Sequence, residues 1–457
     1  MTLTNAQINS ALRTPGASLG VGQFSYSVPT LASIWPTYRP GSEPFSNYGV
    51  LSAVQAGHFR SALALWDQLI APNFTEIVET PASIGEIRVA FTTAEFGTGF
   101  AYSGPPQPSG GRVGDVWIDH RQVSEDFAPG LANGLYETLL HEIGHTLGLK
   151  HPFETPVIPA PFDNQRFTVM SYEGPGIAIS FSGGSNTIQS FIAQVATITP
   201  MVLDIAAVQA IYGASTTTRA DNSTYRFSED SAAVQAVYDS GGIDTFDLSN
   251  FTRPNIIDLR PGAYSSLGQF SRADQISFWT ERFPNFGSFI TSTINSAANL
   301  FTFNDNVGIA LNVTIENALG GSADDEIIGN AAANRLAGNG GADRLTGGGG
   351  TDTAVFSGGR RDYEVTRNGD TVTVRDLRAN ADGTDTLIGI EQAQFADGLM
   401  GLIAEELVLF LPGTRDLITW DSTQGSNGFT YFFRLGANST VAAVADFTGD
   451  GRTDVLL

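Results

Sequence analysis

Cysteine is absent from the 457 residues, so disulfide bonds and thiolate metal sites are excluded. Lysine and arginine together number 24 against 47 acidic residues, and the net charge of -23 argues against a nucleic-acid partner. No run of about 18 apolar residues occurs, so no transmembrane helix is predicted. The first residues lack the basic and apolar regions of a cleaved secretory signal, so export by that route is not predicted.

Histidine is also scarce, yet three of the five histidines lie in the stretch HEIGHTLGLKH, which begins at His141. On a helix, His141 and His145 project from one face on adjacent turns, which suits two bonds to zinc. Gly148 can end that helix with a positive φ, so that His151 approaches the same metal. Three imidazoles leave a fourth position open for water, as in catalytic zinc sites, and Glu142 is placed to meet that water. Chance could produce H-E-x-x-H, but it explains the added glycine and histidine poorly.

The first half of the chain shows the patterns of a mixed α and β domain. Residues 1–20 are polar and small and are expected to be flexible, which leaves 21–213 as the predicted domain. Helical spacing and strand-like alternation predict helices over 51–70, 131–147 and 199–213 and strands over 84–93 and 114–119. Thr199 is the expected cap of the last helix, and Gly213 its end. The segment GTGFAYSG (97–104) is the candidate sheet edge for an extended peptide.

From residue 214 the chain becomes rich in Gly, Asp, Asn, Ser and Thr, with short β-like runs and no predicted long helix. It contains four nonapeptides in register, GGSADDEII, GNAAANRLA, GNGGADRLT and GGGGTDTAV (320–355). In such repeats glycine turns direct carbonyls inward, aspartate supplies a carboxylate, and an apolar residue fills the core. Hard oxygen ligands suit Ca²⁺, and four repeats in register argue against a flexible linker. A β-hairpin is predicted at 360–376, around Asn368-Gly369.

Two nonapeptides form one coil, so turns eighteen residues apart should stack. Asp325 and Asp343 are therefore predicted to serve one calcium ion, and Asn334 and Asp352 a second, weaker site, because Asn334 carries no charge. The predicted ligands in the repeats are Gly320, Asp325, Asn334, Gly338, Asp343, Gly347 and Asp352. The loop DFTGDGRTD (446–454) is either a further calcium loop or a solvated turn.

The zinc motif resembles the H-E-x-x-H-x-x-G-x-x-H signature of the metzincin endopeptidases. That family has a methionine turn beneath the metal, and FTVMSYEG places Met170 there. The form M-S-Y resembles the serralysin branch, which implies that Tyr172 is an additional zinc ligand that swings away and helps to stabilise the oxyanion. The resemblance also implies that Glu142 is the general base. The zinc ligands that it implies are His141, His145, His151 and Tyr172.

The C-terminal half resembles the calcium-binding β-roll of the same branch, through segments 237–249 and 313–321 and the nonapeptides. Further calcium ligands implied by this likeness are Asp239, Gly241, Asp244 and Glu316. Proteins with this roll leave Gram-negative bacteria by type I secretion, and the ending DVLL resembles the motif of that signal or a truncated repeat of RDLITW. Two segments differ from the pattern of the branch. Residues 268–303 form an insertion whose role the sequence does not indicate, and the HPFE segment after the zinc motif leaves the shape of the primed-side pocket undetermined.

The sequence therefore predicts a multidomain protein, with an α+β metzincin zinc-protease domain at 21–213 and an all-β parallel β-roll or β-sandwich domain at 214–457. The predicted function is a bacterial, secreted metalloendopeptidase with one catalytic zinc ion and several structural calcium ions. It is expected to be monomeric, extracellular or attached to the cell surface, with protein or peptide substrates and the type I secretion machinery as partners. The alternative is a calcium-binding surface-layer or adhesive protein whose protease-like domain has little activity. Which protein it cuts is open.

Overall fold

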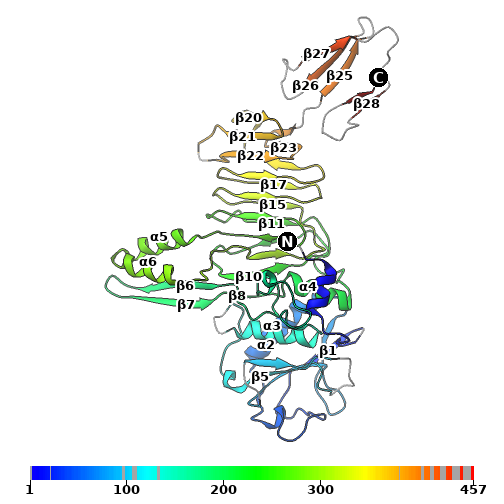
Figure 1. Ribbon diagram of the computed structural model, residues 1–457, viewed down its shortest axis with the longest axis vertical. Helices are drawn as coiled ribbons and strands as arrows, with labels where there is room; N and C mark the ends of the chain where they lie inside the picture. Colours follow the sequence, from blue (N-terminus) through cyan, green and yellow to red (C-terminus); the bar gives the residue numbers. More distant parts are fainter. Residues whose placement is uncertain are drawn as a thin grey trace. The chain divides into compact units, whose positions relative to one another are not determined.

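The computed structural model describes residues 3–20, 22–94, 98–104, 111–130, 134–379 and 381–402, and beyond these the strands of 406–411, 416–421, 429–434, 443–445 and 454–456. Its contacts divide the chain into two compact units that interleave along the sequence (Figure 1). Unit 1 comprises Met1–Ser223, Ser228–Asp244 and Arg260–Thr314. Unit 2 comprises Thr224–Phe227, Thr245–Leu259 and Ile315–Leu457. The domain boundary at 213/214 stays a prediction.

A five-stranded sheet with the order β2-β1-β3-β5-β4 forms the centre of unit 1. Its strands are β1 (Phe24–Ser27), β2 (Phe74–Glu76), β3 (Ile87–Thr92), β4 (Gly99–Ala101) and β5 (Asp115–Asp119). Strand β4 runs antiparallel at the edge, within the segment predicted as an edge; Gly97 lies outside the described residues. The strand predicted over 84–93 is buried along its whole length rather than on one face, because β1 and β5 flank it in parallel.

Four helices of unit 1 accompany this sheet: α1 (Asn5–Leu12), α2 (Ala53–Asp67), α3 (Leu135–Thr146) and α4 (Val202–Tyr212). Helix α3 packs against α2 and contacts β4 and β5. The N-terminal segment, expected to be flexible, forms α1 and packs on α4 with Ile8 and Leu12 buried. On α2, Val54 is 60% exposed, whereas Phe59, Leu63 and Trp66 are buried. None of the described helices is long and apolar enough to cross a membrane.

Helix α4 begins later than its sequence suggests. The expected cap was Thr199, but the residue before the helix is Met201, whose N–H donates to Asp204 at 2.8 Å. The Thr199 hydroxyl instead accepts the N–H of Ala236 at 2.8 Å, so it is already engaged with a strand. Gly213 ends the helix with a φ of 80°, as predicted.

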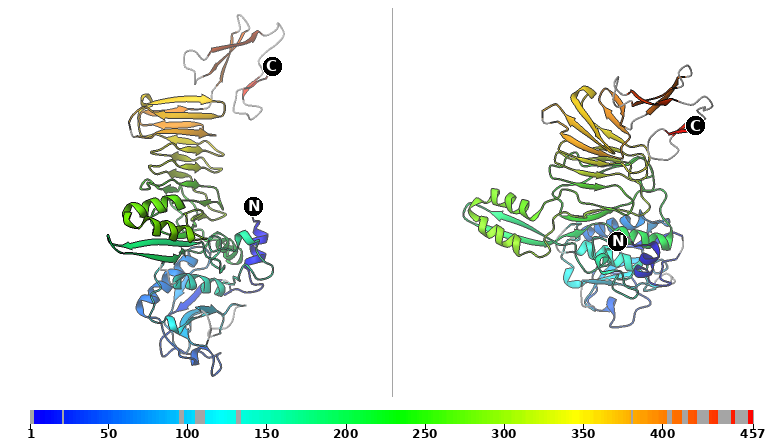
Figure 2. Two further views of the ribbon diagram at one scale, coloured as in Figure 1. Left: turned by 60° about the vertical axis from the view of Figure 1, so that its left-hand side comes forward. Right: turned by 45° about the horizontal axis from the view of Figure 1, so that its top comes forward.

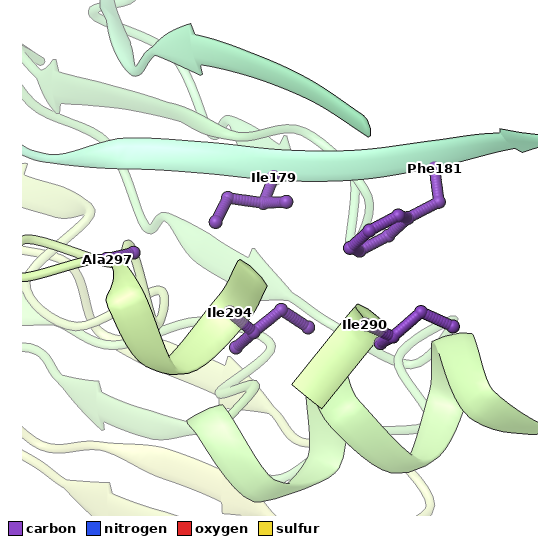
Figure 3. Packing of buried hydrophobic residues seen from close by; sticks show 5 residues of the cluster. All are labelled: Ile179, Phe181, Ile290, Ile294 and Ala297. Atoms are coloured by element: carbon purple, nitrogen blue, oxygen red, sulfur yellow. The ribbon is translucent and has the colours of Figure 1, made fainter. Parts of the chain in front are cut away.

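The insertion near 268–303 contains two helices, α5 (Arg272–Arg282) and α6 (Gly287–Ser296), so the expectation of no long helix after residue 214 was wrong. Both lie along the hairpin of β6 (Ile177–Gly183) and β7 (Ile188–Gln194) (Figure 2). The apolar cluster between them is shown in Figure 3. Its buried members are Ile179, Phe181, Ile290, Ile294 and Ala297. The helices thus depend on a hairpin that lies about a hundred residues earlier in the chain.

A second sheet of unit 1 has the order β13-β14-β10-β8. Its strands are β8 (Ala196–Thr197), β10 (Ala233–Val237), β13 (Tyr264–Ser265) and β14 (Val307–Ile309). Three of them come from beyond residue 214, which is why unit 1 extends past the predicted boundary.

Unit 2 contains two mainly parallel sheets whose strands alternate along the nonapeptides (Figure 1). One consists of β9 (Thr224–Arg226), β11 (Thr245–Asp247), β15 (Asn317–Leu319), β17 (Arg335–Ala337), β19 (Thr353–Val355), β23 (Gln392–Phe395) and β24 (Gly398–Gly401). The other consists of β12 (Ile256–Asp258), β16 (Glu326–Ile328), β18 (Arg344–Thr346), β20 (Tyr363–Asn368), β21 (Thr371–Asp376) and β22 (Thr384–Ile388). Strands eighteen residues apart pair in register, as Ile327 does with Leu345, and both side chains are fully buried.

The C-terminal part adds the predicted hairpin and short strands beyond it. Strands β20 and β21 pair around Asn368-Gly369, which confirms that turn. Beyond residue 402 the described strands are β25 (Glu406–Leu411), β26 (Asp416–Asp421), β27 (Phe429–Arg434), β28 (Ala443–Ala445) and β29 (Asp454–Leu456). The candidate calcium loop at 446–454 lies outside the described residues except for its last residue.

Candidate functional site

The three motif histidines are brought together by the end of α3 and the turn that follows it. His141 and His145 lie one turn apart on α3. Gly148 then takes a φ of 92°, and a Cβ there would lie 2.7 Å from the carbonyl oxygen of Ala17. Glycine is required at this turn for both reasons. The chain reverses through it and returns His151 to the other two histidines.

The imidazole Nε2 atoms converge on one point. His151 Nε2 lies 3.2 Å from His141 Nε2 and 3.1 Å from His145 Nε2. The hydroxyl of Tyr172 lies 2.8 Å from the same His151 atom. The ligand atoms of the three histidines all fall within 4.8 Å of one another.

Each ring is oriented by a hydrogen bond through its other nitrogen. His141 Nδ1 lies 2.8 Å from the Val169 carbonyl oxygen, and His145 Nδ1 lies 2.9 Å from that of Leu149. Because a carbonyl can only accept, these Nδ1 atoms carry the proton and both neutral rings present a lone pair at Nε2. Lone pairs that face one another at about 3 Å repel, and a cation between them removes that repulsion. The donor set therefore fits a divalent metal such as zinc.

Burial sets the charge of this cluster. It lowers the pKa of His141 to about 3 and that of His145 to about 4, so both are neutral at pH 7. Burial also raises the pKa of Glu142 to about 8. Glu142 Oε2 has no hydrogen-bond partner within the described part of the chain. A cation held by the histidines would favour the ionised carboxylate and oppose that shift.

The methionine turn lies directly beneath α3. Met170 is fully buried, and a Cβ on Gly144 would lie 2.7 Å from its Sδ. Asp204 on α4 holds this turn by accepting from Thr168 Oγ1 at 2.6 Å and from the Val169 N–H at 2.7 Å. Burial raises the pKa of Asp204 to about 7. Tyr172 emerges from the turn 66% exposed.

The HPFE segment contributes two contacts that the motif did not reveal. Glu154 Oε1 lies 2.5 Å from His151 Nδ1, so this carboxylate orients the third histidine. The ring of Phe153 stacks on His151 with centroids 4.9 Å apart and an interplanar angle of 8°. Both depend on the predicted turn at Gly148, but the zinc motif itself indicated neither contact.

A cleft of about 430 Å³ opens beside the cluster. Helix α3, the edge strand β4 and the methionine turn enclose it. The described residues that line it are Thr98, Gly99, Gly134, Glu137, Thr138, His141, Glu142, Gln165, Ser171 and Tyr172. The open side of the histidine cluster therefore faces a space large enough for part of a peptide.

In unit 2, predicted calcium ligands lie in register on neighbouring strands. Asp343 Oδ1 accepts the N–H of Asp325 at 2.8 Å, while Asp343 Oδ2 is buried and has no partner among the described residues. A Cβ on Gly338 would overlap with that same Oδ2 atom. Both carboxylate oxygens of Asp325, in contrast, accept hydrogen bonds, one from Gly321 N at 2.6 Å and one from Asn255 N at 2.7 Å. Asp385 extends the row, because its Oδ1 accepts the Asp343 N–H at 3.0 Å.

A second row runs through the other sheet. Asp352 Oδ1 accepts the N–H of Asn334 at 2.7 Å, and Asp352 Oδ2 is buried without a partner in the described structure. A Cβ on Gly347 would overlap with it, and one on Gly320 would lie 2.5 Å from Asp325 Oδ2 in the first row. Glu316 belongs to the second row, since its carbonyl accepts from Asn334 Nδ2 at 2.9 Å.

The remaining predicted calcium residues lie in unit 1. Asp239 Oδ1 accepts the N–H of Gly241 at 2.9 Å, and Asp244 Oδ1 accepts the N–H of Ser223 at 2.7 Å. Gly241 has a φ of 146°. These contacts form a turn, and they bring Asp239 and Gly241 together directly.

Sequence reasoning missed Asp385 and Glu391, which continue the two rows beyond the nonapeptides. Glu391 Oε2 accepts the Asp352 N–H at 2.6 Å. Both residues lie 39 or more positions from their partners, because the β20–β21 hairpin intervenes. The alternation of apolar and polar residues after the hairpin could have indicated that further strands of the two sheets follow there.

Two peptidase family models match most of this chain. The matrixin model of peptidase family M10 matches residues 46–169, and the model described as "Peptidase M10 serralysin C terminal" matches 202–278 and 291–429. The gap between the last two ranges falls within α5 and α6.

Named proteases are similar over about three fifths of the chain. Metalloprotease AprA of Pseudomonas entomophila (strain L48) is 33% identical over 313 residues, 64% of this chain and 56% of that protein. Serralysin of Photorhabdus laumondii is 30% identical over 64% of this chain and 56% of its own length. Serralysin of Proteus mirabilis is 29% identical over 60% of this chain and 53% of its own length. The chain thus spans little more than half the length of these relatives. The extracellular lipase LipA of Serratia marcescens matches at 16% identity, 35% and 30% coverage and a TM-score of 0.13, which carries no argument.

Proposed function

The chain belongs to the serralysin-type M10 metallopeptidases, and from that premise we propose that it is a secreted zinc metalloendopeptidase stabilised by calcium. The observation that carries the proposal is the convergence of three histidine Nε2 atoms beside a buried carboxylate oxygen that has no partner in the described structure. The alternative, an adhesive protein of little activity, is not favoured. A protease domain that had lost its activity would be expected to lack Glu142 or one of the three histidines, and all four residues are present.

His141, His145 and His151 would hold the zinc ion, with Tyr172 as a fourth protein ligand in the absence of substrate. When bound, zinc supplies a Lewis acid that polarises the scissile carbonyl and lowers the pKa of water. The Nδ1 bonds to Val169, Leu149 and Glu154 keep the three rings in the tautomer that binds a metal.

Glu142 acts as the general base. Glu142 lines the cleft, and its carboxylate takes a proton from the attacking water and passes it to the leaving amine. The hydroxyl of Tyr172 donates a hydrogen bond to the oxygen of the scissile carbonyl as that oxygen becomes negative. Its high exposure leaves room for the movement that this role requires.

The substrate is a protein or peptide bound in extended form. Strand β4 has a free edge within the described sheet and borders the cleft through Gly99. A peptide that adds a strand there passes the histidine cluster with alternate side chains directed into the cleft.

Unit 2 is proposed to be a parallel β-roll that binds calcium. The Oδ2 atoms of Asp343 and Asp352, buried without a partner among the described residues, support this, because a cation in each row would satisfy them. Several calcium ions, export by a type I secretion system and an extracellular location complete the proposal. The last two rest on the resemblance of the C-terminal half to the serralysin branch and on the bacterial relatives that share it.

The proposed function is tested by Glu142→Ala. Peptide cleavage should be abolished, because the general base is lost, while zinc stays near one ion per chain by metal analysis, because Glu142 is not a ligand. A variant that loses its zinc would contradict the assigned role. Full retained activity would contradict the mechanism itself.

A further inference from the structure

The cleft beside the histidines has a polar and acidic lining. Two carboxylates, Glu137 and Glu142, share it with the amide of Gln165. No lysine or arginine occurs among the described residues that line it. The net charge of -23 adds a long-range field of the same sign. The cleft therefore favours a cationic over an anionic side chain.

Glu137 occupies a defined position in this lining. It lies one helical turn before His141 on α3, so it shares a face with the zinc motif. Strand β4 closes the cleft on the opposite side, where a Cβ on Gly99 would lie 3.1 Å from Thr138 Cγ2. A peptide paired with the outer edge of β4 would run along the cleft, so a side chain directed into it lies near the face of α3 that carries Glu137.

Glu137 is half-buried and incompletely satisfied. Its Oε1 is buried with no partner among the described residues, and the nearby Thr197 hydroxyl donates to the Gln165 carbonyl at 3.4 Å. Burial raises the pKa of Glu137 to about 7. A buried carboxyl oxygen without a partner carries a free-energy cost, and a donor supplied by the substrate would remove it.

We propose that Glu137 is a specificity-determining residue that selects peptides with lysine or arginine at a position flanking the scissile bond. The ammonium or guanidinium group enters the cleft and donates to Glu137. Gln165 offers a further acceptor in the same lining. Glu142 needs its carboxylate for proton transfer, so Glu137 is the carboxylate available for this pairing. This proposal rests on the proposed function, because it takes the cleft as the substrate site.

Mapping of the cuts that the zinc- and calcium-loaded full-length protein makes in a proteome-derived peptide mixture gives the first test. Lysine and arginine should be enriched at one flanking position. At that position a peptide with lysine should be cut with a kcat/KM higher than its norleucine analogue by on the order of ten- to a hundredfold. Norleucine keeps the length of the side chain and removes the charge.

Glu137→Gln should bring the ratio of kcat/KM for the lysine and norleucine peptides to about one, because it removes the charge and keeps the shape. Glu125→Gln is the matched control, since Glu125 is an exposed acid of unit 1 outside the cleft. It should keep the preference. A wild-type protein without basic enrichment, or a preference that survives in Glu137→Gln, overturns the proposal while the protease function stands.

Binding separates the two proposals. The lysine peptide should bind the wild-type protein about tenfold more tightly than the norleucine peptide, and Glu137→Gln should equalise them. If no peptide is cut but this Glu137-dependent difference remains, the protease function fails and the specificity of the cleft stands. If neither cleavage nor the binding difference is found, both proposals are overturned.

Discussion

At the scale of single residues, the metal cluster depends on hydrogen bonds made away from the metal. His141 and His145 bond to backbone carbonyls, whereas His151 bonds to the Glu154 carboxylate. The third ring is thus oriented by an acidic side chain and the other two by the backbone. It is also the ring that contacts the Tyr172 hydroxyl. If Tyr172 moves on substrate binding as proposed, His151 is the ring whose contact it gives up.

The role of Tyr172 predicts a specific kinetic change. Tyr172→Phe should lower kcat by on the order of ten- to a thousandfold, because one oxyanion donor is lost. KM should change much less, because the hydrogen bond forms only in the transition state. Steady-state kinetics on one fluorogenic peptide measure both.

Two controls accompany this variant. Zinc content must stay near one ion per chain, so that loss of metal does not explain loss of rate. Tyr26→Phe removes a hydroxyl that bonds Glu76 at 3.2 Å in the same unit and should leave kcat unchanged. An unchanged kcat in Tyr172→Phe would reduce Tyr172 to a packed neighbour of the histidines.

The residues around the metal differ in how far the sequence predicts them. The histidines, Glu142 and Met170 lie in short motifs whose spacing follows from one helix and one turn. Asp204 and Glu137 have no such motif, because their roles come from a turn 35 residues away and from a neighbouring strand. The spacing of residues within a motif predicts their local geometry, but it does not predict contacts with segments that are distant in the sequence.

At the scale of elements, the insertion shows the same limit. Helix α5 begins with Ser271 as its N-cap and Asp274 in a capping box, so its start was readable in the sequence. Its apolar residues are few, and its buried side rests on β6 and β7. Composition therefore predicted a β-rich segment, and tertiary packing determined the helices.

The packing of α6 on the hairpin can be tested directly. Ile290 is fully buried against Ile179 and Phe181 (Figure 3), so Ile290→Ala should cost about 2–5 kcal/mol of local stability. Amide exchange in α5 and α6 should rise, while exchange in α3 stays unchanged. Ile192→Ala is the control, because Ile192 is 61% exposed and should cost less than about 0.5 kcal/mol. Equal exchange in both variants would mean that the cluster does not hold the helices.

At the scale of the whole molecule, the chain passes between the two units several times. Residues 228–244 and 260–314 belong to unit 1, although they follow the first strand of unit 2. A fragment that begins at residue 214 would therefore carry strands β10, β13 and β14 without their sheet partner β8. The calcium response of unit 2 is best measured in the full chain.

Unit 2 folds against a like-charge repulsion unless a cation is present. In the unfolded chain Asp325, Asp343 and Asp352 are separated and solvated, whereas the fold buries all three. Burial and neighbouring carboxylates raise the pKa of Asp343, and burial raises that of Asp352 to about 6. Both shifts mean that the fold without calcium disfavours the charged form. In the proposed calcium-bound state the cation would reverse the sign of that electrostatic contribution, and its binding free energy would become part of the folding free energy.

We therefore expect strands β15 to β19 to exchange their amides rapidly in a chelator selective for calcium over zinc and to become protected as calcium is added. Strands β3 and β5 should stay protected throughout. Asp343→Ala should raise the calcium midpoint by on the order of tenfold, because Asp343 Oδ2 is a carboxylate oxygen of its row that has no protein partner in the described structure.

Asn334→Ala should raise that midpoint less, since Asn334 is uncharged and its Oδ1 already accepts the Asn330 N–H at 2.7 Å. Asp370→Ala, which removes an exposed acid from the β20–β21 turn, should leave the midpoint unchanged and so separates ligand loss from a change in net charge. Exchange measured by mass spectrometry along a calcium titration gives all three midpoints. Protection of β15 to β19 without calcium, or equal midpoints for Asp343→Ala and Asn334→Ala, would contradict the stacked arrangement, because its two rows differ in the charge that they bring to the ion.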